Sequence, residues 1–259
     1  MKHFTIDNLQ VEIYGTRQEM GRESASQAAD LIRELLSKKE TINMVFAAAP
    51  SQNEFLDALV VAPDIDWSRV NAFHMDEYIG LPADHPQRFG SYLRNRFFNH
   101  VSLRSLHLLN EGGKDQYEEA RRYAELISQY PIDITLMGVG ENTHIAFNDP
   151  HVADFNDPEK VKVVDIDDTC KQQQVNDGCF PSLEEVPSFA YTLTIPALMS
   201  SKYIFCMVPA KSKAPAIRHT LVDEISAKYP STSLRRHPNA KLYLDQDSAS
   251  EYLMTLASH

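Results

Sequence analysis

The chain is poor in cysteine and glycine for its length. Its 259 residues include 3 cysteines and 9 glycines, and no two cysteines form a CxxC pair. An odd number of unpaired cysteines does not support a disulfide framework, so reduced thiols in a cytoplasmic protein are expected. The chain also has no Gly/Ser-rich, Pro-rich or low-complexity run and no repeat of solenoid length. We therefore expect one domain that spans residues 1–259.

Long apolar runs and blocks of basic residues are absent too. The N-terminus, MKHFTIDNLQ, has no signal-peptide core, and no segment is long enough to span a bilayer. Lys and Arg number 25 against 36 Asp and Glu, which gives a formal net charge of -11 at pH 7. This balance argues against nucleic acid and anionic membranes as partners. A small anionic substrate stays compatible, because a few local cations and backbone amides can bind one.

The motifs of several common enzyme classes are missing. No GxGxxG completes a dinucleotide fingerprint, no HExxH marks a zinc protease, and no GxSxG marks a serine hydrolase. The 10 histidines do not cluster along the chain. We therefore expect neither a bound metal nor a cofactor.

What the sequence does contain is an alternation of strand-like and helix-like segments. Apolar runs typical of strands lie at residues 9–15, 42–50, 67–78, 132–140, 160–166, 190–195, 202–210 and 241–245. Helical periodicity lies at residues 17–38, 51–60, 88–101, 115–130, 212–226 and 248–257. The alternation predicts an α/β fold with a Rossmann-like, mostly parallel sheet and helices on both faces. Ligands of such sheets bind beyond the carboxyl ends of strands, which directs attention to the residues just after them.

The most unusual segment after a strand is GVGENTHIAFNDP, residues 138–150. Gly138 and Gly140 allow the backbone to turn sharply and to approach a ligand closely. A glycine pair of this kind is a weak signal by itself. The segment therefore depends on its histidine for a functional interpretation.

His144 lies four residues after Gly140, close in the sequence to side chains that could fix its tautomer. Asn142 and Asp149 offer an amide and a carboxylate, and a histidine supported by a carboxylate is a usable acid or base near neutral pH. A lone histidine after a strand is more often structural, and that alternative stays open on this segment alone.

HMDEY, residues 74–78, places two acidic side chains at the end of a strand. Adjacent side chains on a strand point to opposite faces, so only one of Asp76 and Glu77 is expected to face a given pocket. The alternative is a solvated acidic loop, which is common for an unaided pair.

Two further segments could bind an anion. The backbone amides of Ser51, Gln52 and Asn53 lie at the start of a predicted helix, where anions bind readily. Lys213 lies where a strand gives way to a helix. A plain helix cap and a solvated surface lysine are the respective alternatives.

Taken together, these segments resemble the glucosamine-6-phosphate deaminase/isomerase family, to which the 6-phosphogluconolactonases are related. The resemblance lies in FHMDEYIGLPADHP, FFNHV, GVGENTHIAFNDP and KSKA, which occur in family order over most of the chain. It implies a Rossmann-like sheet and a cofactor-free aldose–ketose isomerisation of an amino sugar phosphate, coupled to loss of ammonia.

The resemblance also implies roles for individual residues. Asp76 would move a proton between C2 and C1 of the opened sugar. His144 would assist ring opening, and Asp149 would orient it. Lys213 and the loop at residues 51–53 would bind the phosphate. One carboxylate that serves as base and then acid fits the first role, and a histidine fits the second.

Four departures from the family pattern suggest a divergent branch with a different amino sugar phosphate. Asn142 and Thr143 replace the usual Asp-Gly pair, and Asp149 is shorter than the usual glutamate. AAPSQN replaces a glycine-rich phosphate loop, and residues 171–180, KQQQVNDGCF, lack the usual arginine. Substituting Asn142 by aspartate would restore the family residue, so that change is expected to be tolerated.

Three functions compete on these observations. The leading hypothesis is conversion of glucosamine 6-phosphate and water to fructose 6-phosphate and ammonia. The alternatives are a 6-phosphogluconolactonase-like hydrolase and a non-catalytic sugar-phosphate sensor on the same fold. Retention of Asp76 and His144 argues against a sensor, because binding alone does not require both. A homo-oligomer is compatible with the sequence, and no feature of it requires one.

Overall fold

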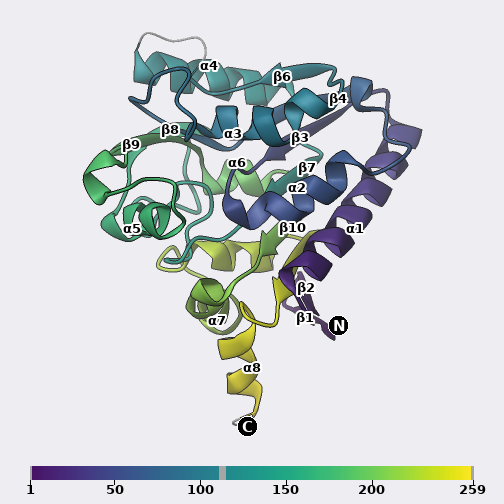
Figure 1. Cartoon of the computed structure of the whole chain (residues 1–259), viewed down its shortest axis with the longest axis vertical. Helices are drawn as coiled ribbons and strands as arrows, with labels where there is room; N and C mark the ends of the chain where they lie inside the picture. Colours follow the sequence, from purple (N-terminus) through teal and green to yellow (C-terminus); the bar gives the residue numbers. More distant parts are fainter. Residues whose placement is uncertain (1, 111–114, 258–259) are drawn as a thin grey trace.

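The computed structural model describes residues 2–110 and 115–257, and its centre is an eight-stranded sheet (Figure 1). The strands are β1 (Lys2–Ile6), β2 (Leu9–Tyr14), β3 (Ile42–Phe46), β4 (Val70–His74), β6 (Ser105–His107), β7 (Ile134–Met137), β10 (Tyr203–Val208) and β11 (Ala240–Asp245). Their order across the sheet is β1-β2-β11-β10-β7-β3-β4-β6. All neighbours are parallel except the β1–β2 hairpin at one edge. The predicted α/β fold with a mostly parallel sheet is confirmed.

Helices cover both faces of this sheet (Figure 1). One face packs against α1 (Arg17–Lys38), α2 (Asn53–Val60) and α3 (Phe89–Arg96). The other packs against α4 (Gln116–Gln129), α6 (Ile195–Met199), α7 (Ala214–Val222) and α8 (Ser250–Ala257). Because successive strand residues point to opposite faces, Phe46 belongs to the first core and its neighbour Val45 to the second. Among the described residues, no helix combines the length and apolarity needed to cross a membrane.

A second, antiparallel sheet lies beside the first. It consists of β5 (Asp76–Tyr78), β9 (Phe189–Leu193) and β8 (Val161–Asp165), in that order. Helix α5 (Asp168–Asn176) packs next to it, around a small core that includes Tyr78 and Phe180. The strand predicted at residues 67–78 is therefore divided between the two sheets. This division places Asp76 opposite the carboxyl edge of the large sheet.

The single tryptophan closes the core on the α3 side. Trp67 is 8% exposed, and its ring meets the ring of Phe97 edge-on at 5.2 Å between centroids. Phe97 in turn lies 5.3 Å from the ring of Phe46 at the end of β3. This aromatic cluster packs the connection after α3 against the large sheet.

The structure corrects several predicted boundaries. The helix expected from residue 51 begins at Asn53, because Pro50–Gln52 form a 3-10 turn, and Ser51 makes no side-chain cap. The helix expected over 88–101 ends at Arg96, and that expected over 212–226 spans only Ala214–Val222. The sequence patterns missed β1, β6, α5 and α6, which are short or lie at exposed edges.

Candidate active site

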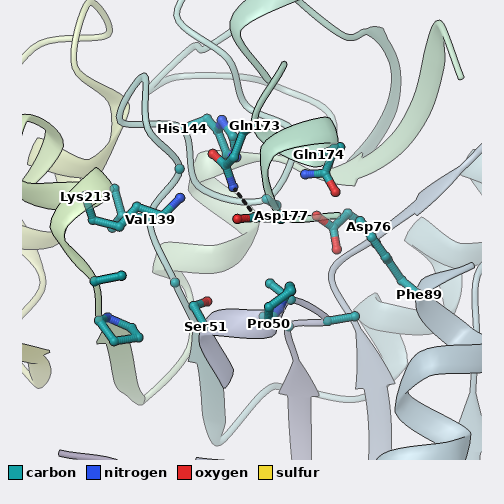
Figure 2. A pocket seen from close by; sticks show the side chains of 18 of the residues that line it. Pro50, Ser51, Asp76, Phe89, Val139, His144, Gln173, Gln174, Asp177 and Lys213 are labelled. Atoms are coloured by element: carbon teal, nitrogen blue, oxygen red, sulfur yellow. Dashed lines mark hydrogen bonds between the residues drawn. The ribbon is translucent and has the colours of Figure 1, made fainter. Parts of the chain in front are cut away.

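A pocket lies at the carboxyl ends of β3, β7 and β10, where the small sheet adjoins the large one (Figure 2). This edge of a parallel sheet is where ligands bind in such folds. The pocket is open to solvent, as access by a small molecule requires. Of the predicted site residues, its lining includes Ser51, Asp76, Gly138, Gly140, His144 and Lys213.

A tight turn after β7 presents His144 to this pocket. The Gly140 N–H donates to the His144 carbonyl at 2.8 Å, and Thr143 has a φ of 70°. A Cβ atom on Gly140 would lie 2.1 Å from Cε1 of the imidazole. Only glycine fits there, because any side chain would displace the ring. Gly138 has a related role, since a Cβ there would lie 3.1 Å from the Gln52 amide nitrogen.

The imidazole is held on one side by two acceptors. His144 Nδ1 lies 2.6 Å from Asn142 Oδ1 and 3.1 Å from Asp149 Oδ1. The His144 backbone N–H also donates to Asn142 Oδ1, at 3.0 Å. Because both partners of Nδ1 are oxygens that accept, Nδ1 carries the hydrogen in the neutral ring and Nε2 is left as the acceptor.

Asp149 is fully buried, yet the pKa of its carboxyl lies below the ordinary value. Burial raises the pKa of its carboxyl, but His144, the Asn142 amide and the Asp167 N–H together lower the pKa below its ordinary value. Asn142 Nδ2 donates to Asp149 Oδ1 at 3.0 Å, and the Asp167 N–H donates to Asp149 Oδ2 at 3.2 Å. Asn142 and Asp149 thus lie behind the imidazole rather than in the pocket lining.

Asp76 and Glu77 point in opposite directions from β5, as their adjacency requires. Asp76 lines the pocket at 8% exposure, and burial, with the charge of Glu77, raises its pKa well above the ordinary value. Glu77 accepts hydrogen bonds from the backbone N–H groups of Tyr78, Phe89 and Gly90 at 2.9, 3.0 and 2.9 Å. Glu77 therefore fixes the start of α3. We call Asp76 and His144, with its partners, the acid–base end.

Two cations, Arg17 and Lys213, line the pocket with the Ser51 hydroxyl, and we call this part the anion end. In the view of Figure 2, Lys213 lies across the pocket from Asp76, with Ser51 between and below them. Lys213 is 6% exposed, and its ammonium makes no ion pair with any described carboxylate. Burial lowers its pKa, while Asp177 and Glu141 oppose that effect.

Two predicted anion-binding amides have other partners. The Gln52 N–H donates to the Ala49 carbonyl at 2.9 Å, and the Asn53 N–H donates to Pro50. The Gln52 side chain bonds Ser51 Oγ and the Met207 carbonyl, so it ties this loop to β10. Gln52 and Asn53 are therefore not among the lining residues, and the 3-10 turn explains why.

The pocket lining also includes Arg17 and residues of helix α5, which the sequence analysis did not predict as site residues. Arg17 begins α1, pairs with Glu54 at 2.6 Å and donates to the Pro50 carbonyl at 3.1 Å. Gln173, Gln174 and Asp177, from α5 and its end, line the opposite wall (Figure 2). Helix α5 shows no apolar stripe and so gave no usable sequence signal. Arg17 lies just after β2, so the rule that directs attention to residues beyond strand ends could have found it.

Two groups of side chains have the spacing of metal ligands: His144, Asp149 and Cys170, and Asp149, His151 and Asp167. Both use Asp149, whose two oxygens already accept hydrogen bonds from Asn142, His144 and the Asp167 N–H. These N–H donors occupy the positions that a cation would take. The arrangement therefore suits proton handling better than metal binding.

Comparison with known proteins identifies the family. A model of the family described as glucosamine-6-phosphate isomerases/6-phosphogluconolactonase matches residues 15–243. A glucosamine-6-phosphate deaminase of Thermoanaerobacter pseudethanolicus is 34% identical over 236 residues, which cover 88% of this chain and 90% of that protein. The corresponding deaminase of Listeria welshimeri is 32% identical over 226 residues, covering 87% and 94%.

Solved structures give the same result. A monomeric glucosamine-6-phosphate deaminase of the NagB superfamily superposes with a TM-score of 0.84 at 29% identity, over 93% of this chain and 99% of the other. A 6-phosphogluconolactonase of Thermotoga maritima shares the fold, with a TM-score of 0.72 at 18% identity over 93% and 100% of the two chains. The chain therefore belongs to the family of glucosamine-6-phosphate isomerases and 6-phosphogluconolactonases.

Proposed function

We propose that this protein is an amino-sugar-phosphate deaminase that converts glucosamine 6-phosphate and water to fructose 6-phosphate and ammonia. The observation that supports it most directly is the placement of two acid–base groups in one pocket. Asp76, on β5, and His144, after β7, face the same space from different sheets, and Lys213 lies apart from both. Isomerisation of an aldose needs both groups, whereas binding alone needs neither.

Ring opening is the step for His144. Its Nε2 is the free acceptor, because Nδ1 is held by Asn142 and Asp149. Nε2 takes the proton from the anomeric hydroxyl and returns a proton to the ring oxygen as the C1–O5 bond breaks. Asp149, ionised behind the ring, stabilises the imidazolium that forms in between.

Proton transfer between carbons is the step for Asp76. Its carboxylate takes the proton from C2 of the open aldehyde while a proton of the substrate's ammonium passes to O1, which leaves an enolamine. The Asp76 carboxyl then returns the proton to C1. A buried carboxylate with a raised pKa is a stronger base than one in water and can keep the proton between the two transfers. The product at C2 is an imine.

Water completes the reaction by adding to C2 of the imine, so that the C2–N bond breaks and ammonia leaves as the C2 carbonyl forms. Throughout these steps the phosphate stays at the anion end, near Lys213 and the Ser51 hydroxyl. A phosphorylated sugar is retained inside cells, and the proposal accordingly places the enzyme in the cytoplasm.

The test is release of ammonia from glucosamine 6-phosphate, measured beside hydrolysis of 6-phosphogluconolactone by the same preparation. Ammonia and fructose 6-phosphate in equal amounts support the deaminase. Lactone hydrolysis without ammonia supports the hydrolase that shares this fold. Binding of the amino sugar phosphate by calorimetry, without turnover of either compound, would leave only a sensor.

A further inference from the structure

The start of helix α5 is bonded to the residue that holds the imidazole. Asp167 is the N-cap of α5, and its Oδ1 accepts from the Cys170 N–H at 2.7 Å. Its other oxygen, Oδ2, accepts from Asn142 Nδ2 at 2.9 Å. One carboxylate therefore caps the helix and binds the amide behind His144.

This contact decides which way the Asn142 amide points. Asn142 Nδ2 has two acceptors, Asp149 Oδ1 at 3.0 Å and Asp167 Oδ2 at 2.9 Å. With the nitrogen on that side, Asn142 Oδ1 must face the imidazole, where it accepts from His144. A flipped amide would set its oxygen against two carboxylates and its NH2 against the Nδ1–H, so four favourable contacts would be lost.

A second bond ties the same helix to the same loop. Gln173 Oε1 accepts from the Glu141 N–H at 2.9 Å, one residue before Asn142. Gln173 also lines the pocket, together with Gln174 and Asp177. The helix that forms one pocket wall and the turn that carries the histidine are therefore joined at two points.

We propose that Asp167 is a positioning residue: it fixes the Asn142 amide and, through it, the tautomer and orientation of the His144 imidazole relative to α5. Asn142 and Asp167 are a matched pair, with the amide at 142 required by the carboxylate at 167. The consequence for turnover rests on the proposed function, but the positioning itself concerns only the imidazole.

The pair reverses the expectation drawn from the family pattern. An aspartate at 142 would have no N–H to donate and would lie beside both Asp149 and Asp167. Three carboxylates in contact cannot all ionise without strong repulsion. Asn142→Asp, which restores the usual family residue, is therefore harmful in this chain. Exchanging the two groups, in the double variant Asn142→Asp/Asp167→Asn, leaves the new carboxylate at position 142 beside Asp149 but replaces its contact with a second carboxylate by an amide that can donate to it.

The experiment compares four variants with the parent. Asn142→Asp is expected to lower kcat at least about tenfold, and the double variant to recover part of that loss, because one of the two carboxylate contacts is relieved. Asp167→Ala is expected to lower kcat about tenfold with little change in KM. Asp168→Asn, the matched control, removes an exposed carboxylate from the same helix start and should change nothing, because Asp168 does not contact Asn142.

The 15N chemical shifts of the His144 ring nitrogens give a second measurement. They report the tautomer directly and would not change if Asp167 had only a structural role. The titratable groups that face the imidazole are Asp149, Asp167 and Cys170, with Asp76 and Lys213 across the pocket. The parent should show hydrogen on Nδ1. Asn142→Asp should move the 15N shifts of the imidazole away from the parent pattern, and the double variant should bring them back toward it.

Two outcomes would overturn the inference. One is an Asn142→Asp variant with the activity and the imidazole spectrum of the parent. The other is a folded double variant, judged by its melting temperature, that is no better than the single. A parent that releases no ammonia would defeat the proposed function alone, because the NMR measurement still decides whether Asp167 positions His144.

Discussion

The two ends of the pocket are built differently. At the acid–base end, the side chains of Asn142, Asp149 and Asp167 are joined by hydrogen bonds behind the imidazole. At the anion end, Lys213 is buried without an ion pair to any described carboxylate. A network fixes direction, which proton transfer requires, whereas an unpaired cation supplies only attraction. The comparison predicts losses of kcat at one end and of KM at the other.

The largest effect is expected at Asp76. Asp76→Asn preserves size but cannot accept the C2 proton, so kcat should fall by about 10² or more while KM changes little. Turnover in heavy water, with the C1 hydrogen of the product followed by NMR, checks the role. If Glu77→Gln loses C1 labelling while Asp76→Asn keeps it, the two roles are reversed.

The same variant should change stability with pH. The folded state holds the Asp76 proton to a higher pH than the unfolded chain does, so stability falls as pH rises above the ordinary aspartate pKa of about 4. Asp76→Asn removes that fall. Its melting temperature should exceed that of the parent at pH 7 and approach it near pH 4. A melting temperature that is lower at pH 7 would contradict the burial argument.

An intermediate effect is expected at Asp149. Asp149→Asn removes the charge that supports the imidazolium and sets a new amide against Asn142, so kcat should drop at least about tenfold. The pH profile of kcat/KM should lose its acid limb or shift it to lower pH, because the imidazolium is less stabilised. Full activity in this variant would make Glu141 the better candidate for the partner.

The smallest effect on kcat is expected at Lys213. Its contact with the phosphate persists through the reaction, so Lys213→Ala should mainly raise KM for the phosphorylated sugar. Lys211→Ala is the matched control, because Lys211 is exposed and bonds Ser250 at 2.6 Å outside the pocket lining. Equal KM values for the two variants would remove Lys213 from the anion end.

The sequence predicted the large sheet and the residues that directly follow its strands. His144, Lys213 and Ser51 all lie there, because buried parallel strands give clear apolar runs and their carboxyl ends share one edge. The second sheet was not separable from the first, since β5 has only three residues and continues the run of β4.

The other wrong predictions arose because the interacting partners could not be recognised from the local sequence. Asn142 was interpreted from its neighbours alone, but Asp167, 25 positions away, determines what that position tolerates. The amides at residues 52 and 53 were expected to be free, and the 3-10 turn begun at Pro50 uses them. Arg17 is an exception: it lies just after β2, at the same edge of the parallel sheet, so the strand-end rule applied there would have predicted it.

The aromatic cluster around Trp67 has a practical consequence. Trp67 is the only tryptophan of the chain, is 8% exposed and meets the ring of Phe97 edge-on, so it dominates the intrinsic fluorescence. It is not among the residues that line the pocket, so its emission should follow unfolding and remain insensitive to ligand. Unfolding of each variant described above by denaturant can thus be followed by tryptophan fluorescence, without a label. The measurement distinguishes a variant that is folded but inactive from one that has lost its fold.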